Sequence, residues 1–272
     1  MRTISIISLK GGTWKTTTSV NFSWILAVIF GKRVLYIEND KQGNGSKSFN
    51  RYSQEDKNTI ARVMTEENID VREIIKETAY PNLHMVSANM ELLTANIKTM
   101  MDFGRQQQTR FRKAFERVQN DYDYCIIDNA PDINISIINA LVMSDDVIIP
   151  FMIDEYSFDG FDILKEQIEN TKEDFNGKLN FKGCLITQYQ KDDINAQGIE
   201  ILKNVHKVPV FNQCIRRTDK WRESSFARMP LAEYSSRSSS SQDYRKFVSE
   251  YLTMVEGNVP NLGTEKGGNN GI

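Results

Sequence analysis

Short apolar runs separate longer, more polar segments along most of the chain. The runs are four to eight residues long and occupy residues 4–9, 33–38, 83–87, 124–127, 146–151, 182–188 and 208–215. This is the usual length of a buried strand, and the segments between the runs carry apolar side chains at helical spacing. Strands that alternate with helices pair in parallel and need cover on both faces. The pattern therefore predicts an α/β fold with a mostly parallel, twisted sheet and helices on both faces.

The expected helices occupy residues 20–30, 90–101, 105–119, 137–143, 163–172 and 199–205, whereas residues 49–77 are polar and only helical in tendency. The clearest helical stripe comes last, where Tyr244, Phe247, Val248, Tyr251 and Leu252 recur at helical spacing. It predicts a final helix that docks on the core. We expect one domain over residues 1–255. Residues 256–272 are rich in Gly and Asn without periodicity, so we expect a disordered tail.

The segment between the first apolar run and the first helix reads SLKGGTWKTTT over residues 8–18. A strand, a glycine-containing turn, Lys-Thr and a helix are the context of a phosphate-binding loop. The backbone N–H groups of such a loop and of the helix N-terminus point at an anion. Lys15 would reach the β- and γ-phosphates, and the Thr16 hydroxyl would hold Mg²⁺. The candidate nucleotide-binding residues are Lys10, Gly11, Gly12, Thr13, Trp14, Lys15, Thr16 and Thr17.

Trp14 departs from this pattern, because the residue before the lysine is normally glycine. The backbone there wraps around the phosphates with a positive φ, which glycine reaches at no steric cost. A bulky residue in that conformation is strained by about 1–3 kcal/mol. The sequence leaves open whether the indole swings out or plugs the loop. We predict that Trp14 weakens nucleotide binding or hinders switching between states.

Two further apolar runs deliver a carboxylate at the end where ligands bind in open α/β sheets. Asp40 follows the run at residues 33–38, within Glu38-Asn-Asp40-Lys-Gln-Gly-Asn44. Asp128 ends the run Tyr124-Cys-Ile-Ile-Asp128, an arrangement that would hold Mg²⁺ directly or through water. For Asp40 a plain turn is the alternative, since Asp and Asn are common turn formers.

The loop resembles the deviant Walker A motif, KGGxGKTT, of the ParA/MinD superfamily of P-loop ATPases. The resemblance extends to DxDPQGN at residues 38–44 and YDxIIIDxPP at residues 122–131, and covers about residues 2–254. Departures are Trp14, Glu38, Lys41 and the Asn129-Ala130 pair. With no further domain expected before the first strand, the chain resembles the short ParA type.

The resemblance implies an ATPase that binds ATP and Mg²⁺ and forms a homodimer around two nucleotides. It implies that Lys10 reaches the partner's nucleotide, that Lys15 acts on phosphate, that Thr16 and Asp128 serve the metal, and that Asp40 places the attacking water. Partners would be non-specific DNA and a ParB-like centromere-binding protein, in plasmid or chromosome segregation. The implied location is the cytoplasm, on the nucleoid.

Two later segments supply further candidates. In relatives, the loop after the last strand borders the adenine, so Arg216 and Gln188 are candidate base contacts. Positive charge is in excess over residues 216–246, where relatives bind DNA, and the DNA candidates are Arg216, Arg217, Lys220, Arg222 and Arg245. Phosphate contacts of this kind give salt-sensitive, sequence-independent affinity. An ordinary solvated surface remains the alternative, because acidic residues interrupt the segment.

Composition limits the possible DNA, metal and membrane sites. The net charge is −2, so no global basic field attracts nucleic acid and any DNA contact must be a local patch. The three cysteines lie far apart without metal-ligand spacing, which indicates buried, reduced thiols. Residues 20–30 are too short and interrupted to span a membrane, and the C-terminus has no amphipathic anchor of the MinD type.

Alternatives of other classes stay open. Trp14 favours a nucleotide-dead or nucleotide-locked adaptor that still binds DNA or a partner. A tyrosine kinase of the same superfamily would need a C-terminal tyrosine cluster, and an iron–sulfur reductase would need paired bridging cysteines. Neither feature is present in the sequence.

Overall fold

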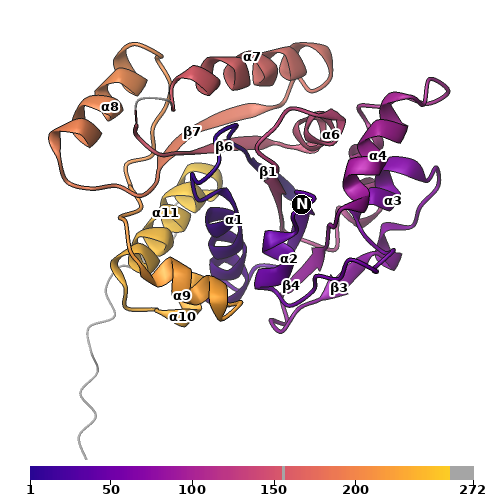
Figure 1. The fold of residues 1–272 in the computed structure, drawn as a ribbon, viewed down its shortest axis with the longest axis horizontal. Helices are drawn as coiled ribbons and strands as arrows, with labels where there is room; N and C mark the ends of the chain where they lie inside the picture. The colour runs from indigo at the N-terminus through magenta and orange to yellow at the C-terminus, as the bar shows by residue number, and fades with distance from the viewer. Residues whose placement is uncertain (155–156, 258–272) are drawn as a thin grey trace, which may run out of the picture.

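A seven-stranded sheet forms the centre of the protein (Figure 1). The computed structural model describes residues 1–154 and 157–257, so the tail expected over residues 256–272 lies almost wholly outside the described residues. The strand order is β3-β4-β2-β5-β1-β6-β7. The bounds are β1 Arg2–Ile6, β2 Val34–Asn39, β3 Ile75–Glu77, β4 Leu83–Val86, β5 Tyr124–Asn129, β6 Asp146–Phe151 and β7 Asn180–Ile186. Every pairing is parallel except that of β3 with β4, which confirms the predicted mostly parallel sheet.

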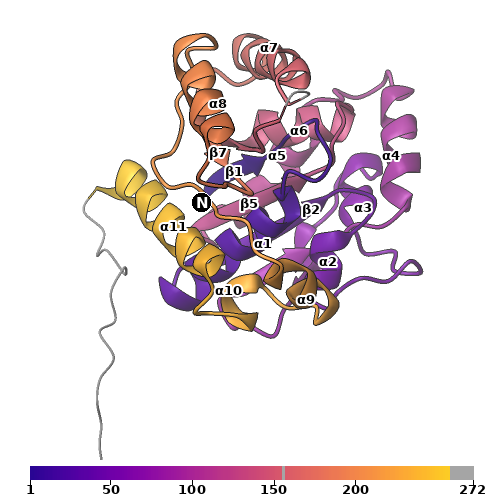
Figure 2. The ribbon, with the colours of Figure 1, turned by 60° about the vertical axis from the view of Figure 1, so that its left-hand side comes forward.

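Helices cover both faces because buried side chains alternate along the strands. On β5, Tyr124 and Ile126 face one helical layer, whereas Cys125 and Ile127 face the other. The first layer holds α1 Lys15–Trp24 with the π-helical turn Ile25–Ile29, α9 Lys220–Phe226, α10 Leu231–Tyr234 and α11 Ser239–Glu256 (Figure 2). The second holds α3 Ile60–Thr65, α4 Glu91–Met100, α5 Arg110–Phe115, α6 Ile135–Met143, α7 Asp159–Asp174 and α8 Asp193–Asn204. A short helix, α2 Asn44–Ser48, follows β2.

The final helix is confirmed as a core element. Tyr244, Phe247, Val248, Tyr251 and Leu252 of α11 are all fully buried against α1 and the sheet. Tyr251 also donates a hydrogen bond of 2.6 Å from Oη to the buried carboxylate of Asp146. The apolar stripe therefore fixes this helix, and the Tyr251 hydroxyl ties it to β6.

The expected strand at residues 208–215 is wrong. Only isolated bridges link this segment to β7 and the residues after it, at Val210 and Arg216. Pro209 has no N–H to donate, and the N–H groups of Asn212 and Gln213 donate to the Glu250 carboxylate on α11 at 2.8 and 2.9 Å. Phe211 N and Ile215 N still donate to Cys184 O and Ile186 O of β7, at 3.0 and 2.8 Å, but the missing and diverted donors between them interrupt the ladder, so no continuous strand forms.

Two other predictions need correction. Residues 49–77 contain the antiparallel edge strand β3, although their composition suggested only helix. The helix expected over residues 105–119 is shorter, consisting of α5 and a 3₁₀ turn at Glu116–Val118. Asp102 accepts hydrogen bonds from Gly104 N, Arg105 Nε and Arg110 Nη2. These bonds hold the residues before α5 in a turn. Among the helices described, none is both long enough and apolar enough to cross a bilayer.

Candidate nucleotide-binding site

The glycine-containing loop lies at the carboxyl end of the central strand β1, which is flanked by β5 and β6. This edge of a parallel α/β sheet is where ligands bind. The loop leads directly into α1, which begins at Lys15. The strand, turn and helix predicted from residues 4–30 are therefore arranged as a phosphate-binding loop requires, although β1 ends at Ile6 and the helix begins earlier than expected.

The loop presents a run of free backbone donors. In the part of the chain that the structure describes, no acceptor is bonded to the N–H groups of residues 11–17. Apart from the adjoining residues, no described heavy atom lies within 4 Å of the position that a Cβ would take on Gly11 or Gly12, and Gly12 has a φ of +79°. The carbonyls point elsewhere, since Thr13 O accepts from Thr187 Oγ1 at 3.0 Å and Gly12 O accepts from Gln188 Nε2 at 2.6 Å. The donors and the open space fit a phosphate chain.

Both lysines of the motif lie at this loop. Lys15 is 8% exposed, and its Nζ donates to Lys10 O at 3.1 Å. Burial lowers the pKa of Lys15, while Asp128, Asp40 and Asp132 act in the opposite direction. The side chain of Lys10 instead forms an ion pair with Asp154 and donates to Ser157 Oγ at 3.2 Å. Lys15 thus points along the loop, whereas Lys10 is held by the segment after β6.

Asp128, at the end of β5, is fully buried next to α1. Ser19 Oγ donates to its Oδ1 at 3.0 Å, and Tyr36 Oη donates to its Oδ2 at 3.0 Å. Burial raises the pKa of Asp128 to about 6, although hydrogen bonds from Thr16 and Ser19 and the charge of Lys15 favour the carboxylate. Thr16 and Asp128, the two predicted metal ligands, are therefore together beside Lys15.

Asp40 is partly buried at the end of β2. Its Oδ1 accepts from Gln42 N at 2.9 Å, so the carboxylate does cap a turn. It is nevertheless close enough to Lys15 to act on that residue's pKa. The structure is consistent with both readings of Asp40, because one oxygen is enough for the turn.

Trp14 has the backbone conformation that glycine normally supplies, with φ 61° and ψ 32°. Its indole is only 6% exposed and joins the apolar layer formed with α1 and α11. The ring contacts Trp221 on α9, with centroids 6.2 Å apart and planes at 52°. Since the space beside Gly11 and Gly12 is open, the indole does not fill the loop there. Of the two arrangements left open by the sequence, the side chain swings out and packs behind the loop.

The candidate base and DNA residues have different surroundings. Gln188 contacts the loop through Gly12 O, whereas Arg216 forms a two-point ion pair with the buried carboxylate of Asp243 at 2.8 Å for each contact. Lys220 pairs with Glu223, and the guanidinium of Arg222 lies 5.7 Å from the Trp221 ring centroid. Arg217 and Arg222 are exposed, but Arg245 is half-buried along α11.

Several residues of the site were not predicted. Ser19 lies one helical turn after Lys15, so the spacing of α1 would have placed it on the same face. Tyr36 lies two residues before Glu38 on one side of β2, and only the strand order brings it to Asp128. Thr187 and Trp221 reach the loop from distant segments, for which the sequence carries no local signal.

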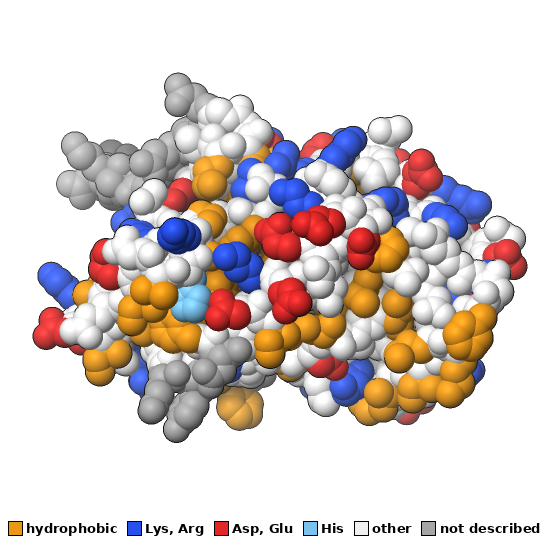
Figure 3. Space-filling view, turned by 90° about the horizontal axis from the view of Figure 1, so that it is seen from above, with side chains coloured by type: hydrophobic (Ala, Val, Ile, Leu, Met, Phe, Trp, Pro, Cys, Tyr) orange, Lys and Arg blue, Asp and Glu red, His pale blue; other side chains and the backbone are white. Residues whose placement is uncertain are grey.

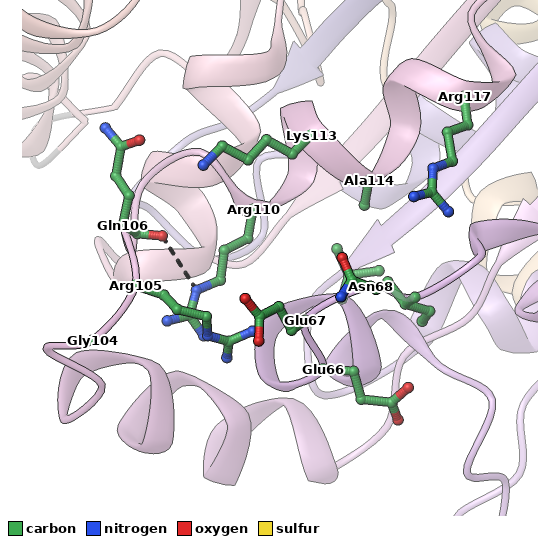
Figure 4. Close-up of a pocket in the computed structure, with 12 residues that line it drawn as sticks. Glu66, Glu67, Asn68, Gly104, Arg105, Gln106, Arg110, Lys113, Ala114 and Arg117 are labelled. Atoms are coloured by element: carbon green, nitrogen blue, oxygen red, sulfur yellow. Dashed lines mark hydrogen bonds between the residues drawn. The ribbon is translucent and has the colours of Figure 1, made fainter.

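A cavity of about 480 Å³ lies away from the loop, between α3 and α5. Figure 4 shows that charged side chains of both signs line it, among them Glu67, Arg110 and Arg117. Arg110 is engaged by Asp102 and by the carbonyls of Met64 and Gln106. No loop residue, Asp40 or Asp128 lines this cavity, so it is separate from the nucleotide site.

The loop, Lys15 and the buried carboxylate at the end of a neighbouring strand define a P-loop nucleotide-binding protein. The family described as AAA domain matches residues 1–181. The sporulation initiation inhibitor protein Soj of Bacillus subtilis is 32% identical over 91% of this chain and 96% of its own length. The chromosome partitioning protein ParA of Caulobacter vibrioides is 28% identical over 93% and 94%.

A solved structure with the same fold is that of cobyrinic acid a,c-diamide synthase from Mycobacterium smegmatis, with bound ADP and magnesium. It has a TM-score of 0.82 at 22% identity and covers 94% of this chain and 96% of its own. The chain belongs to the family described as AAA domain and to the ParA/MinD superfamily of P-loop ATPases.

Proposed function

We propose that this protein is a ParA-type partition ATPase that binds ATP with Mg²⁺ and dimerises. The observation that carries the proposal is the run of N–H donors at residues 11–17, which bond to none of the described residues and lie beside Lys15 and Asp128. Similarity to Soj and to a chromosome partitioning ParA supports the process, which would be segregation of a plasmid or chromosome.

Each site residue has a role in this proposal. The loop N–H groups and Lys15 hold the phosphates, while the Thr16 hydroxyl and the Asp128 carboxylate hold the metal. Bound Mg²⁺ would neutralise charge that develops on the phosphates. Asp40 orients the attacking water with the oxygen that the turn leaves available. Lys10 must leave Asp154 and Ser157 before it can reach a partner's nucleotide. In the monomer, the ion pair with Asp154 therefore keeps the Lys10 side chain away from that position.

Trp14 is the feature that sets this chain apart from the usual loop. Its indole packs against Trp221 and leaves the N–H donors free, which supports binding of phosphate. The same packing anchors the loop to α9. We propose that the impairment falls mainly on switching, because any movement of the loop must break the aromatic contact or move α9 with it.

The remaining parts of the proposal follow the family. The dimer binds DNA without sequence preference through exposed cations, of which Arg217 and Arg222 are the most available. A ParB-like centromere-binding protein stimulates hydrolysis and release, and the protein acts in the cytoplasm on the nucleoid. The main alternative is an adaptor of the same fold that binds DNA or a partner without nucleotide exchange.

The test combines hydrolysis with DNA binding. Phosphate release should require Mg²⁺ and should be lost in Lys15→Gln and Lys10→Ala, with nucleotide binding kept in the latter. DNA affinity with ATP should fall in Arg217→Glu and Arg222→Glu, and less in Arg117→Glu, an exposed arginine outside the segment. A protein that binds DNA equally well with and without ATP and releases no phosphate is the adaptor.

A further inference from the structure

Helix α4 is apolar on two faces. Its inner face packs into the core through Leu92, Ala95 and Thr99, which are at most 3% exposed. Its outer face and the residues that flank the helix carry a second set of large apolar side chains that are 41% to 91% exposed: Met90, Leu93, Ile97, Met100, Met101 and Phe103. Met90, Leu93, Ile97 and Met100 recur at intervals of three or four residues and so form one stripe, which Met101 and Phe103 extend beyond the C-terminal end of the helix. The core does not use this stripe.

The stripe is an exposed surface of a kind that monomers rarely keep. Contiguous apolar patches of this sort mark interaction sites. In Figure 3, apolar side chains gather at the right-hand end of the molecule, where α4 lies in Figure 1. Three of the six residues are methionines, whose flexible side chains adapt to a packed partner. The surface therefore fits a helix that packs along α4.

Charged side chains at the border of the stripe limit which surfaces can pack against it. On the side toward α3, the flank of α4 carries the half-buried Glu91 and the exposed Lys98. Lys98 has no acidic partner among the residues that the structure describes, whereas Glu91 pairs with the exposed Lys57. The cavity with charged walls in Figure 4 lies beyond the C-terminal end of α4. The apolar surface therefore ends there.

We propose that the outer face of α4 binds the same face of a second copy of this chain, in an antiparallel arrangement. A two-fold axis between residues 94 and 95 sets Glu91 at the level of Lys98 of the partner, and the reverse contact forms by symmetry. Within one residue of the same register, Leu93 meets the partner's Ile97, and Met90 meets its Met100. Both the charges and the apolar side chains are thus self-complementary.

This contact is independent of the proposed nucleotide function. α4 supplies none of the loop, Lys15, Thr16, Asp40 or Asp128, so association through it requires no nucleotide. Together with a dimer formed around ATP, it would link dimers into larger assemblies. Its failure would leave the ATPase proposal intact, and the reverse is also true.

The first experiment is sedimentation of the full chain without nucleotide over a range of concentrations. Ile97→Glu should weaken self-association by at least about tenfold, since it buries an unpaired charge. Met254→Glu is the matched control, because Met254 on α11 is equally exposed at 50% but lies outside the stripe. A monomeric wild type, or equal effects of the two substitutions, would overturn the proposal.

The second experiment tests the register in a Cys214→Ser background, where the remaining cysteines are buried. Thr94→Cys lies next to the axis and should cross-link to itself with a short bismaleimide. Met101→Cys is more exposed but about 20 Å from its symmetry mate at 1.5 Å per residue, so it should not. Lys98→Glu should weaken association, and Lys98→Glu with Glu91→Lys should restore it. Equal cross-linking at both sites, or no rescue, contradicts this arrangement.

Discussion

Replacing Trp14 with glycine should lower the free energy of unfolding, even though glycine suits the backbone better. The indole is 6% exposed and packs on Trp221, and removal of a buried aromatic side chain costs about 3–5 kcal/mol. Relief of the left-handed backbone at φ 61° returns about 1–2 kcal/mol. The added freedom of glycine in the unfolded chain costs about 0.5–1 kcal/mol. The net loss is about 2–4 kcal/mol.

Trp14→Ala separates the two contributions. Alanine loses the same packing but keeps a Cβ in the strained conformation, so it should be less stable than the glycine variant by about 1 kcal/mol. Urea unfolding followed by far-ultraviolet circular dichroism measures all three proteins without relying on tryptophan fluorescence. A Trp14→Gly variant as stable as the wild type, or a Trp14→Ala variant more stable than Trp14→Gly, would contradict this prediction.

Three further predictions concern buried contacts. Tyr251→Phe removes the hydrogen bond to the Asp146 carboxylate and should lower the unfolding free energy by about 1.5–3 kcal/mol; an unchanged denaturation midpoint would show that this bond adds nothing. Burial raises the pKa of Glu38 well above its usual value of 4.5, so the folded protein holds a proton that the unfolded chain has released, and stability falls as the pH rises. Glu38→Gln should therefore gain stability relative to wild type between pH 4.5 and 7 in parallel unfolding curves, and parallel pH profiles would refute this. Gly45→Ala would set a Cβ 1.8 Å from Tyr36 Oη and should lower the melting temperature through a loss of about 1–3 kcal/mol, whereas an unaltered value would mean that the tyrosine moves freely.

Periodicity and motif spacing predicted the elements that depend on local sequence. The strand β6 and the helix α4 match their predicted bounds within one residue, because each combines an apolar pattern with clear flanking breaks. The loop motif likewise predicted where Lys15, Thr16 and Asp128 meet. These features follow from the local sequence pattern and from the rule that the carboxyl ends of parallel strands lie at the same edge of the sheet.

Other features depend on contacts between distant segments. The strand expected at residues 208–215 is disrupted by Pro209 and by the backbone N–H groups that donate to Glu250. No local sequence pattern predicts these hydrogen bonds to Glu250. The direction of the Trp14 side chain depends on Trp221, more than two hundred residues later. The ion pairs of Lys10 with Asp154 and of Arg216 with Asp243 also arise only in the folded chain.

The proposed function depends above all on binding of ATP with Mg²⁺ by the loop at residues 10–17. The most direct measurement is a calorimetric titration of ATP–Mg²⁺ into the wild type, Lys15→Gln and Trp14→Gly, with dimerisation followed in the same samples. We expect that the wild type binds ATP–Mg²⁺, that Lys15→Gln loses this binding, and that Trp14→Gly binds and dimerises more readily. No binding by either the wild type or Trp14→Gly, or equal binding by Lys15→Gln and the wild type, would contradict it.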